Sequence, residues 1–133
     1  MKKVMAFGTF DIFHDGHKSY LEQAKKMGDF LVVVIARDET VLRIKSQWTQ
    51  NSEEERLEVV EKSGLADEVI LGGAEDRYMV IERYRPDVIA LGYDQSVDLP
   101  ELTEKLKNLK LQAEIVRMQG YRPEKFKSSK LRK

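Results

Sequence analysis

The chain has 133 residues, enough for one domain with a single core and little more. Lys plus Arg and Asp plus Glu number 23 each, so the formal net charge is zero and no global field attracts nucleic acid or an anionic membrane. The absence of cysteine excludes disulfides, thiolate metal sites and a cysteine nucleophile.

The hydropathy pattern predicts a protein without a membrane-spanning segment. The longest apolar run, residues 30–36, is too short to cross a bilayer. The first residues, Met-Lys-Lys and a short apolar stretch, superficially suggest a signal peptide, but residues 8–15 interrupt the stretch with Asp and His. We therefore expect a first strand here, in a cytoplasmic protein with neither a membrane nor a nucleic acid as partner.

Short runs rich in Val and Ile alternate with segments of helical spacing. The predicted strands are residues 4–8, 30–36, 68–71, 87–92 and 113–118. The second and the fourth are nearly continuous apolar runs, typical of strands covered on both faces in a parallel sheet.

Two helices are predicted before the third strand. The first, residues 17–27, repeats apolar side chains at three- and four-residue steps, and Gly28 is placed to end it. Ser52 and Glu55 have the form of a capping box that opens the second helix, which stops near Gly64.

Two more helices are predicted further along the chain. One includes residues 78–82 and must end before Pro86, because the residue before a proline disfavours helical backbone. Pro100 stands where a first helical residue belongs, ahead of leucines at helical spacing. Strands alternating with helices predict a single Rossmann-like, doubly wound α/β domain with a five-stranded parallel sheet.

The turn after the first strand, residues 8–17, reads Gly-Thr-Phe-Asp-Ile-Phe-His-Asp-Gly-His. In an open parallel sheet, ligands bind outside the carboxyl ends of the strands. Gly8 permits a tight turn and a close backbone approach to a ligand, and Gly16 keeps the start of the next helix free of side-chain bulk. The unpaired N–H groups at that helix start suit a phosphate.

The two histidines of the chain, His14 and His17, both fall in this turn. Three residues apart at the head of a helix, they can face one ligand and donate hydrogen bonds to phosphoryl oxygens as charge builds during group transfer. The alternatives are a surface pair and a metal pair. Zinc normally takes a third protein ligand, and no Cys or third His is present to supply one.

Gly-Thr-Phe-Asp at 8–11 followed by His-x-Gly-His at 14–17 resembles the signature of the cytidylyltransferase-like nucleotidyltransferase superfamily. Three more segments resemble the archaeal-type FAD synthetases, which transfer AMP from ATP to FMN: 36–39, 91–95 and 127–130. Glycerol-3-phosphate cytidylyltransferases, similar in size and opening motif, are the nearest alternative. The resemblance implies a nucleotidyltransferase domain over 1–133, with the basic segment 121–133 contributing to the active site.

The resemblance implies a nucleotide site at the first turn, where Thr9 and Phe10 would contact the nucleotide. The residues implied to surround its phosphates are His14, Asp15, Gly16 and His17, the two histidines being catalytic. Core packing is the alternative for Phe10 and Phe13, and we favour it for Phe13. Asp11 either touches the ligand or braces the turn.

Lys45 is expected in the polar connection after the second strand, where similar enzymes place a catalytic lysine on the triphosphate. Arg43 competes for this role, and the alternative for Lys45 is a solvated loop side chain. Trp48 in the same loop either covers a base or flavin ring by stacking or seals the loop onto the body, and we favour the seal. Arg56, on the second predicted helix, either faces the triphosphate or pairs with nearby glutamates.

Two later segments are implied to complete the site. Asp94, after the fourth strand, matches a position that contacts the nucleotide in similar enzymes, and its alternative is a turn or N-cap aspartate. The tail is implied to supply nucleotide and phosphate ligands, or else is a solvated end: Tyr121, Arg122, Lys127, Ser128 and Ser129. Lys127 departs from the family pattern, in which this place is often apolar.

The implied reaction moves AMP from ATP to FMN and gives FAD and pyrophosphate. Mg²⁺ or another divalent cation is expected with the triphosphate. No protein metal ligand is predicted, because the sequence shows no cluster of carboxylates that would form a metal-binding site. The alternatives are a cytidylyltransferase using CTP and glycerol 3-phosphate, an enzyme for another small phosphorylated acceptor, a nucleotide-binding sensor, and an assembly subunit with a vestigial site. The resemblance is also compatible with a homodimer.

Overall fold

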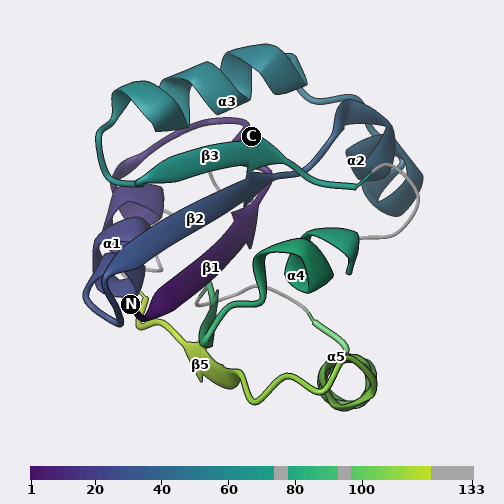
Figure 1. Cartoon of the computed structure of the whole chain (residues 1–133). Coiled ribbons are helices and arrows are strands. Elements are labelled where there is room, and N and C mark those ends of the chain that lie inside the picture. Colours follow the sequence, from purple (N-terminus) through teal and green to yellow (C-terminus); the bar gives the residue numbers. More distant parts are fainter. Residues whose placement is uncertain (74–77, 93–96, 121–133) are drawn as a thin grey trace.

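The computed structural model describes residues 1–73, 78–92 and 97–120. Within these ranges, five parallel strands form one sheet in the order β3-β2-β1-β4-β5, with helices on both faces (Figure 1). The strands are β1 Lys3–Gly8, β2 Phe30–Ile35, β3 Glu68–Leu71, β4 Val88–Leu91 and β5 Glu114–Arg117. The helices are α1 Asp15–Lys25, α2 Asp38–Lys45, α3 Glu53–Lys62, α4 Met79–Tyr84 and α5 Leu99–Asn108. The predicted doubly wound α/β fold is confirmed, with each strand within one residue of its predicted bounds.

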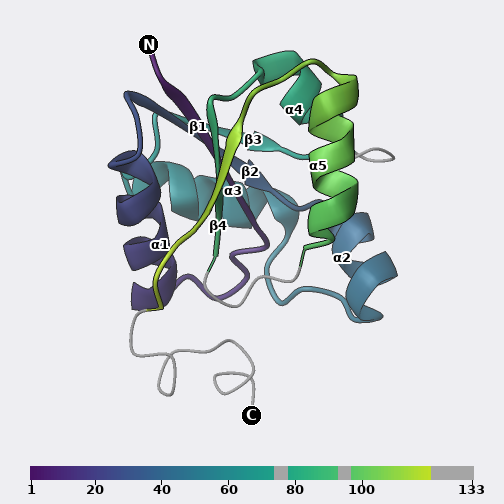
Figure 2. The ribbon, with the colours of Figure 1, turned by 90° about the horizontal axis from the view of Figure 1, so that it is seen from below.

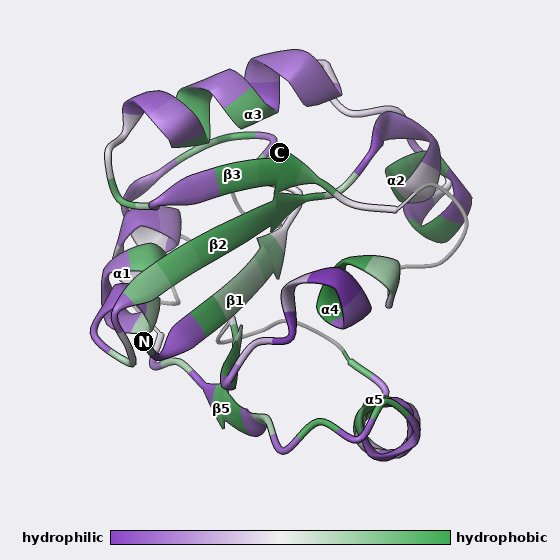
Figure 3. Cartoon of the chain, in the orientation of Figure 1, coloured by the Kyte–Doolittle hydropathy of each residue, from purple (hydrophilic) through white to green (hydrophobic). Residues whose placement is uncertain are grey.

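Both faces of the sheet are buried, which explains the continuous apolar runs. Successive side chains of a strand point to opposite faces. The cluster on one face joins β1 and β2 to α1 and α3 and includes Ala6, Val33, Leu21 and Val60. The cluster on the other face joins the same strands to α4 and α5 and includes Met5, Val32, Ile81 and Leu106. Figure 2 shows α1 and α5 on opposite sides of the sheet, and Figure 3 shows the apolar strands between helices with polar outer surfaces.

Tyr20 fixes α1 to the middle of the sheet. Its hydroxyl donates to the carbonyl of Ala90 in β4 at 2.6 Å and accepts from the N–H of Phe7 in β1 at 3.2 Å. Burial raises the pKa of Tyr20, so the hydroxyl keeps its proton. Between β1 and β4 the direction of the crossovers reverses, and in such sheets ligands bind at the carboxyl ends near the reversal. Tyr20 therefore anchors α1 beside the place where a ligand is expected.

Gly28 does not end α1, contrary to the prediction. The helix ends at Lys25, and its C-cap, Lys26, keeps ordinary right-handed helical backbone. A Cβ at position 28 would lie 2.7 Å from the carbonyl oxygen of Lys2, so the glycine is required where the chain passes close to the start of β1.

The helix starts follow their capping residues. The predicted capping box before α3 is confirmed, since the Ser52 hydroxyl accepts from the Glu55 N–H at 3.2 Å and the Glu55 carboxylate accepts from the Ser52 N–H at 3.0 Å. Gly64 follows α3 with a φ of 73°, the left-handed backbone that glycine often supplies just after a helix. Among the described residues, no helix has both the length and the apolar character that crossing a bilayer needs.

Candidate active site

The turn that follows β1 folds back over an aromatic ring. Phe10 has a φ of 55°, and its side chain is 3% exposed and packs beside Tyr20 and His17. A Cβ on residue 8 would lie 2.6 Å from that ring, so Gly8 is required by a close approach within the chain. A left-handed φ outside glycine is uncommon and concentrates at functional sites. The predicted nucleotide contacts of Thr9 and Phe10 stay predictions. Because the ring of Phe10 is buried, its contact would have to be made by its backbone.

His14 and His17 close the N-terminus of α1 as a reciprocal pair. Nδ1 of His14 accepts from the N–H of Gly16 at 3.0 Å, and Nδ1 of His17 accepts from the N–H of His14 at 3.3 Å. This is the arrangement of a capping box, with imidazoles in place of the usual hydroxyl and carboxylate. The rings stack with their centroids 3.9 Å apart, and half-buried Phe13 packs against the ring of His17 and the core. The structure thus brings the two predicted catalytic histidines together beside Asp15, the first residue of α1.

The backbone contacts decide where each ring carries its proton. A backbone N–H can only donate, so Nδ1 of each ring holds no proton and the neutral imidazole is protonated on Nε2. Burial, and after it the neighbouring His14, lowers the pKa of His17 from 6.5 to about 4, against a hydrogen bond with the backbone of Ile12 that raises it. His17 is therefore neutral at pH 7, and its ring already carries on Nε2 the proton that it can donate to a phosphoryl oxygen.

The neutral, partly buried His17 predicts a loss of stability in mild acid. Because its pKa is 6.5 as a free group and about 4 in the folded chain, the unfolded state binds more protons between these values. The free energy of unfolding should therefore fall as the pH drops from about 6.5 toward 4.5. Free carboxyl groups titrate at about 4, mostly below this window.

Urea unfolding midpoints measured from about pH 7 to pH 5 check this expectation. The midpoint of the wild-type chain should fall across the range and that of His17→Asn should fall less, since an amide does not titrate there. The Asn side-chain oxygen can still accept from the N–H of His14, so the helix cap is preserved. Parallel pH profiles for the two proteins would show that His17 does not titrate as described.

Asp11 braces the turn, one of the two roles predicted for it. Its side chain is buried, and its carboxylate accepts from the N–H groups of Gln50 at 2.8 Å and Asn51 at 2.9 Å.

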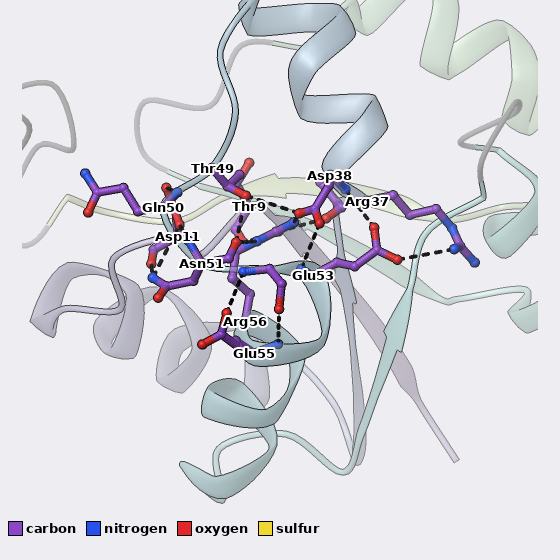
Figure 4. A network of polar contacts seen from close by, with 12 residues as sticks. Thr9, Asp11, Arg37, Asp38, Thr49, Gln50, Asn51, Glu53, Glu55 and Arg56 are labelled. Carbon is purple, nitrogen blue, oxygen red and sulfur yellow. Dashed lines mark hydrogen bonds and ion pairs between the residues drawn. The ribbon is translucent and has the colours of Figure 1, made fainter.

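The buried Arg56 does not face a triphosphate or pair with glutamates. Its guanidinium donates to three backbone carbonyls and one carboxylate, those of Thr9, Ala36, Asn51 and Asp38 (Figure 4).

Lys45 is the last residue of a helix, α2, where a polar loop was predicted. The helix has eight residues and buries only Val41, so its apolar periodicity is weak. Its charge pattern could have revealed it, because Asp38 and Glu39 in the first turn and Arg43 in the last turn complement a helix dipole. The catalytic role of Lys45, and the competing role of Arg43, stay predictions.

Trp48 lies in the segment after α2 and is 68% exposed, so the prediction that it seals this segment onto the body is wrong. Ile44, near the end of α2, is also largely exposed. The alternative role of Trp48, covering a base or a flavin ring, stays open.

The other predicted ligands lie outside the described residues: Asp94, Tyr121, Arg122, Lys127, Ser128 and Ser129. Their roles stay predictions. Within residues 1–73, 78–92 and 97–120, no group of three or more His, Asp or Glu side chains is placed to hold a metal ion. The described part of the chain therefore offers no ready cluster of ligands to a divalent cation.

The chain matches known proteins over most of its length. The model of the family described as Cytidylyltransferase-like matches residues 5–133. The chain belongs to this family. It is 50% identical over 120 residues to an FAD synthase of Ferroglobus placidus, with 90% of this chain and 78% of that protein covered. It is 43% identical over 132 residues to an FAD synthase of Methanothermobacter thermautotrophicus, with 97% and 87% covered.

A solved structure from Thermoplasma volcanium also resembles this member of the cytidylyltransferase-like family. It is named lipopolysaccharide core biosynthesis protein, and it superposes with a TM-score of 0.86 at 42% identity over 91% of this chain and 98% of that one. Relatives of similar identity thus carry names that describe different roles. The shared fold leaves the acceptor as the point that an assay has to decide.

Proposed function

We propose that this chain is an FAD synthase, which transfers AMP from ATP to FMN and releases pyrophosphate. The curated relatives of that name, matched over most of their length, support the choice of ATP and FMN as substrates. The observation that supports the chemistry is the stacked pair His14 and His17, held at the head of α1 where the chain leaves β1. Imidazole N–H donors at a helix N-terminus are suited to an anionic phosphoryl group in transfer.

The transfer requires no covalent intermediate on the protein. An oxygen of the FMN phosphate attacks the α-phosphorus of ATP, and the new P–O bond forms as the bond to the oxygen bridging the α- and β-phosphates breaks. Pyrophosphate leaves with that electron pair. Because the attacking phosphate is already ionised near neutral pH, the reaction needs no general base, which fits histidines held as donors.

Catalysis then consists of positioning and charge stabilisation. The N–H groups of His14 and His17 donate to phosphoryl oxygens, and for His17 the phosphoryl oxygen replaces the backbone of Ile12 as partner. Lys45 adds a positive charge from the end of α2. The divalent cation enters with the triphosphate as part of the substrate, so Mg²⁺ or another divalent ion is bound mainly by ATP.

Product analysis with purified protein tests the proposal. ATP or CTP is offered with FMN or glycerol 3-phosphate in separate reactions containing magnesium. FAD from ATP and FMN is the expected product. CDP-glycerol from CTP would overturn the acceptor while keeping the transfer chemistry, and nucleotide binding without product in any pairing would overturn transfer itself in favour of a nucleotide sensor.

Trp48→Ala is expected to raise the KM for FMN about tenfold if the exposed indole stacks on the flavin, since such a stacking contact contributes about 1–3 kcal/mol. Because Trp48 is 68% exposed, its loss should leave the urea unfolding midpoint unchanged. Trp48→Phe, which keeps a ring, is the matched control and should retain most of the affinity. A rise in the KM for ATP alone would assign the indole to the adenine, and no rise for either substrate would exclude both roles.

Three expectations stay predictions. They are a homodimer, a location in the cytoplasm, and a contribution of the basic segment 121–133 to the site. None of them is required for the reaction written above.

A further inference from the structure

Arg56 lies where four chain segments meet around the carboxyl ends of β1 and β2. Its Nη1 donates to the carbonyl of Thr9, just after β1, and to that of Ala36, just after β2, both at 2.8 Å. Its Nε donates to the carbonyl of Asn51, ahead of α3, at 3.1 Å. Its Nη2 donates to Oδ1 of Asp38, in the first turn of α2, at 2.6 Å. Figure 4 shows these segments converging on the guanidinium.

The Arg56 side chain has no exposed surface, so it does not reach a nucleotide. A guanidinium holds five N–H donors in a rigid planar fork, and a single such group can therefore set several acceptors at fixed angles to one another. A lysine in its place would supply a compact point charge with rotatable donors, which fixes no such geometry.

Two carboxylates extend the arrangement to the segment between α2 and α3. Oδ1 of Asp38, besides its contact with Arg56, accepts from the hydroxyl of Thr49 at 3.1 Å. Asp11, in the turn between β1 and α1, holds the N–H groups of Gln50 and Asn51. The turn after β1 and the end of the α2–α3 connection are therefore tied to each other as well as to the guanidinium.

We infer that Arg56 is a positioning residue that fixes the distance and orientation between the two halves of the active site. One half is the turn after β1, which leads to His14 and His17. The other is α2, which begins beside Arg56 and ends in Lys45. Both halves must act on one triphosphate, and a misplacement of about 1 Å can cost about 100-fold in rate. The inference rests on the proposed function, because that function assigns the triphosphate to both halves.

A double-mutant cycle between Arg56 and Lys45 tests this role. We expect Lys45→Ala to lower kcat about 100-fold in the wild-type background. In the Arg56→Lys background Lys45 is already displaced from the phosphates, so the same substitution should lower kcat about tenfold or less. If Arg56 served stability alone, the factor for Lys45→Ala would be the same in both backgrounds, and that result would overturn the inference.

Ser52→Ala is the matched control. Ser52 caps α3, the helix that carries Arg56, and its hydroxyl accepts from the N–H of Glu55. This variant weakens the same helix, yet the factor for Lys45→Ala should stay at about 100-fold. If Arg56→Lys fails to fold by circular dichroism, Asp38→Asn takes its place. The Asp38 side chain is 26% exposed, so this substitution weakens the pair from its solvent side, and the factor should again shrink.

A failure of the proposed function can be told apart from a failure of this inference. FAD formation by the wild-type chain tests the former, whereas the ratio of the two Lys45→Ala factors tests the latter. The same ratio is also measured from the Kd for ATP and for CTP, where no acceptor is involved. A smaller factor in the Arg56→Lys background supports the inference for whichever nucleotide binds, and equal factors, or no binding of either nucleotide, overturn it.

Discussion

Replacing His17 with alanine is expected to lower kcat for FAD formation about 100- to 1,000-fold, with a much smaller change in the KM for ATP. The reason is that charge on the phosphoryl oxygens builds up in the transition state, where a preorganised N–H donor acts most strongly. The stacked partner ring of His14, 3.9 Å away, cannot move into the vacant place without losing its own contact with the N–H of Gly16. Steady-state kinetics with saturating FMN measures both constants.

Two further variants separate catalysis from helix capping in this experiment. His17→Asn keeps an acceptor for the N–H of His14 but removes the imidazole donor, so it should share the loss in kcat and retain more stability than His17→Ala. Glu22→Ala, on the exposed surface of the same helix, should leave kcat unchanged. A folded His17→Ala enzyme with wild-type kcat would mean that the histidine pair only caps α1.

The strands could be predicted from the sequence because their burial is nearly complete. Val32 and Val33 face opposite clusters, so β2 reads as an unbroken apolar run. The helix α2 could not be found in the same way, because Val41 is its one buried side chain and periodicity needs several. The sequence predicts a helix end at Gly28 because its close approach to the carbonyl of Lys2 is a long-range contact, which no local pattern reveals.

The site could be predicted only in part, because motifs reveal local chemistry and not long-range contacts. The His-x-Gly-His spacing placed His14 and His17 at a helix head, but the neutral state of His17 depends on burial, which spacing does not encode. The acceptors of Arg56 include Thr9, which is 47 residues away in the chain, so the neighbouring glutamates suggested the wrong partners. The exposure of Trp48 is likewise a property of the folded chain.

Arg56→Met is expected to lower the free energy of unfolding by about 3–5 kcal/mol, the range found when one partner of a buried charged pair is removed. Methionine keeps an unbranched apolar stem but is shorter than arginine and carries no donor, so the carbonyls of Thr9, Ala36 and Asn51 lose a hydrogen bond inside the protein. The carboxylate of Asp38 loses its ion pair as well. Urea unfolding at neutral pH measures the change.

Lys62→Met on the same helix is the appropriate comparison for Arg56→Met. Lys62 pairs with Glu58 through a side chain that is 75% exposed, and such surface pairs contribute little to stability because water and salt screen them. The two substitutions therefore remove the same sign of charge from α3 and differ in burial. A loss for Arg56→Met no larger than for Lys62→Met would mean that water or a rearranged backbone satisfies the freed carbonyls, and that the guanidinium does not hold the ends of β1 and β2 together. A loss of the expected size would show that the guanidinium stabilises the fold by joining these two strand ends, a contact that no local motif encodes.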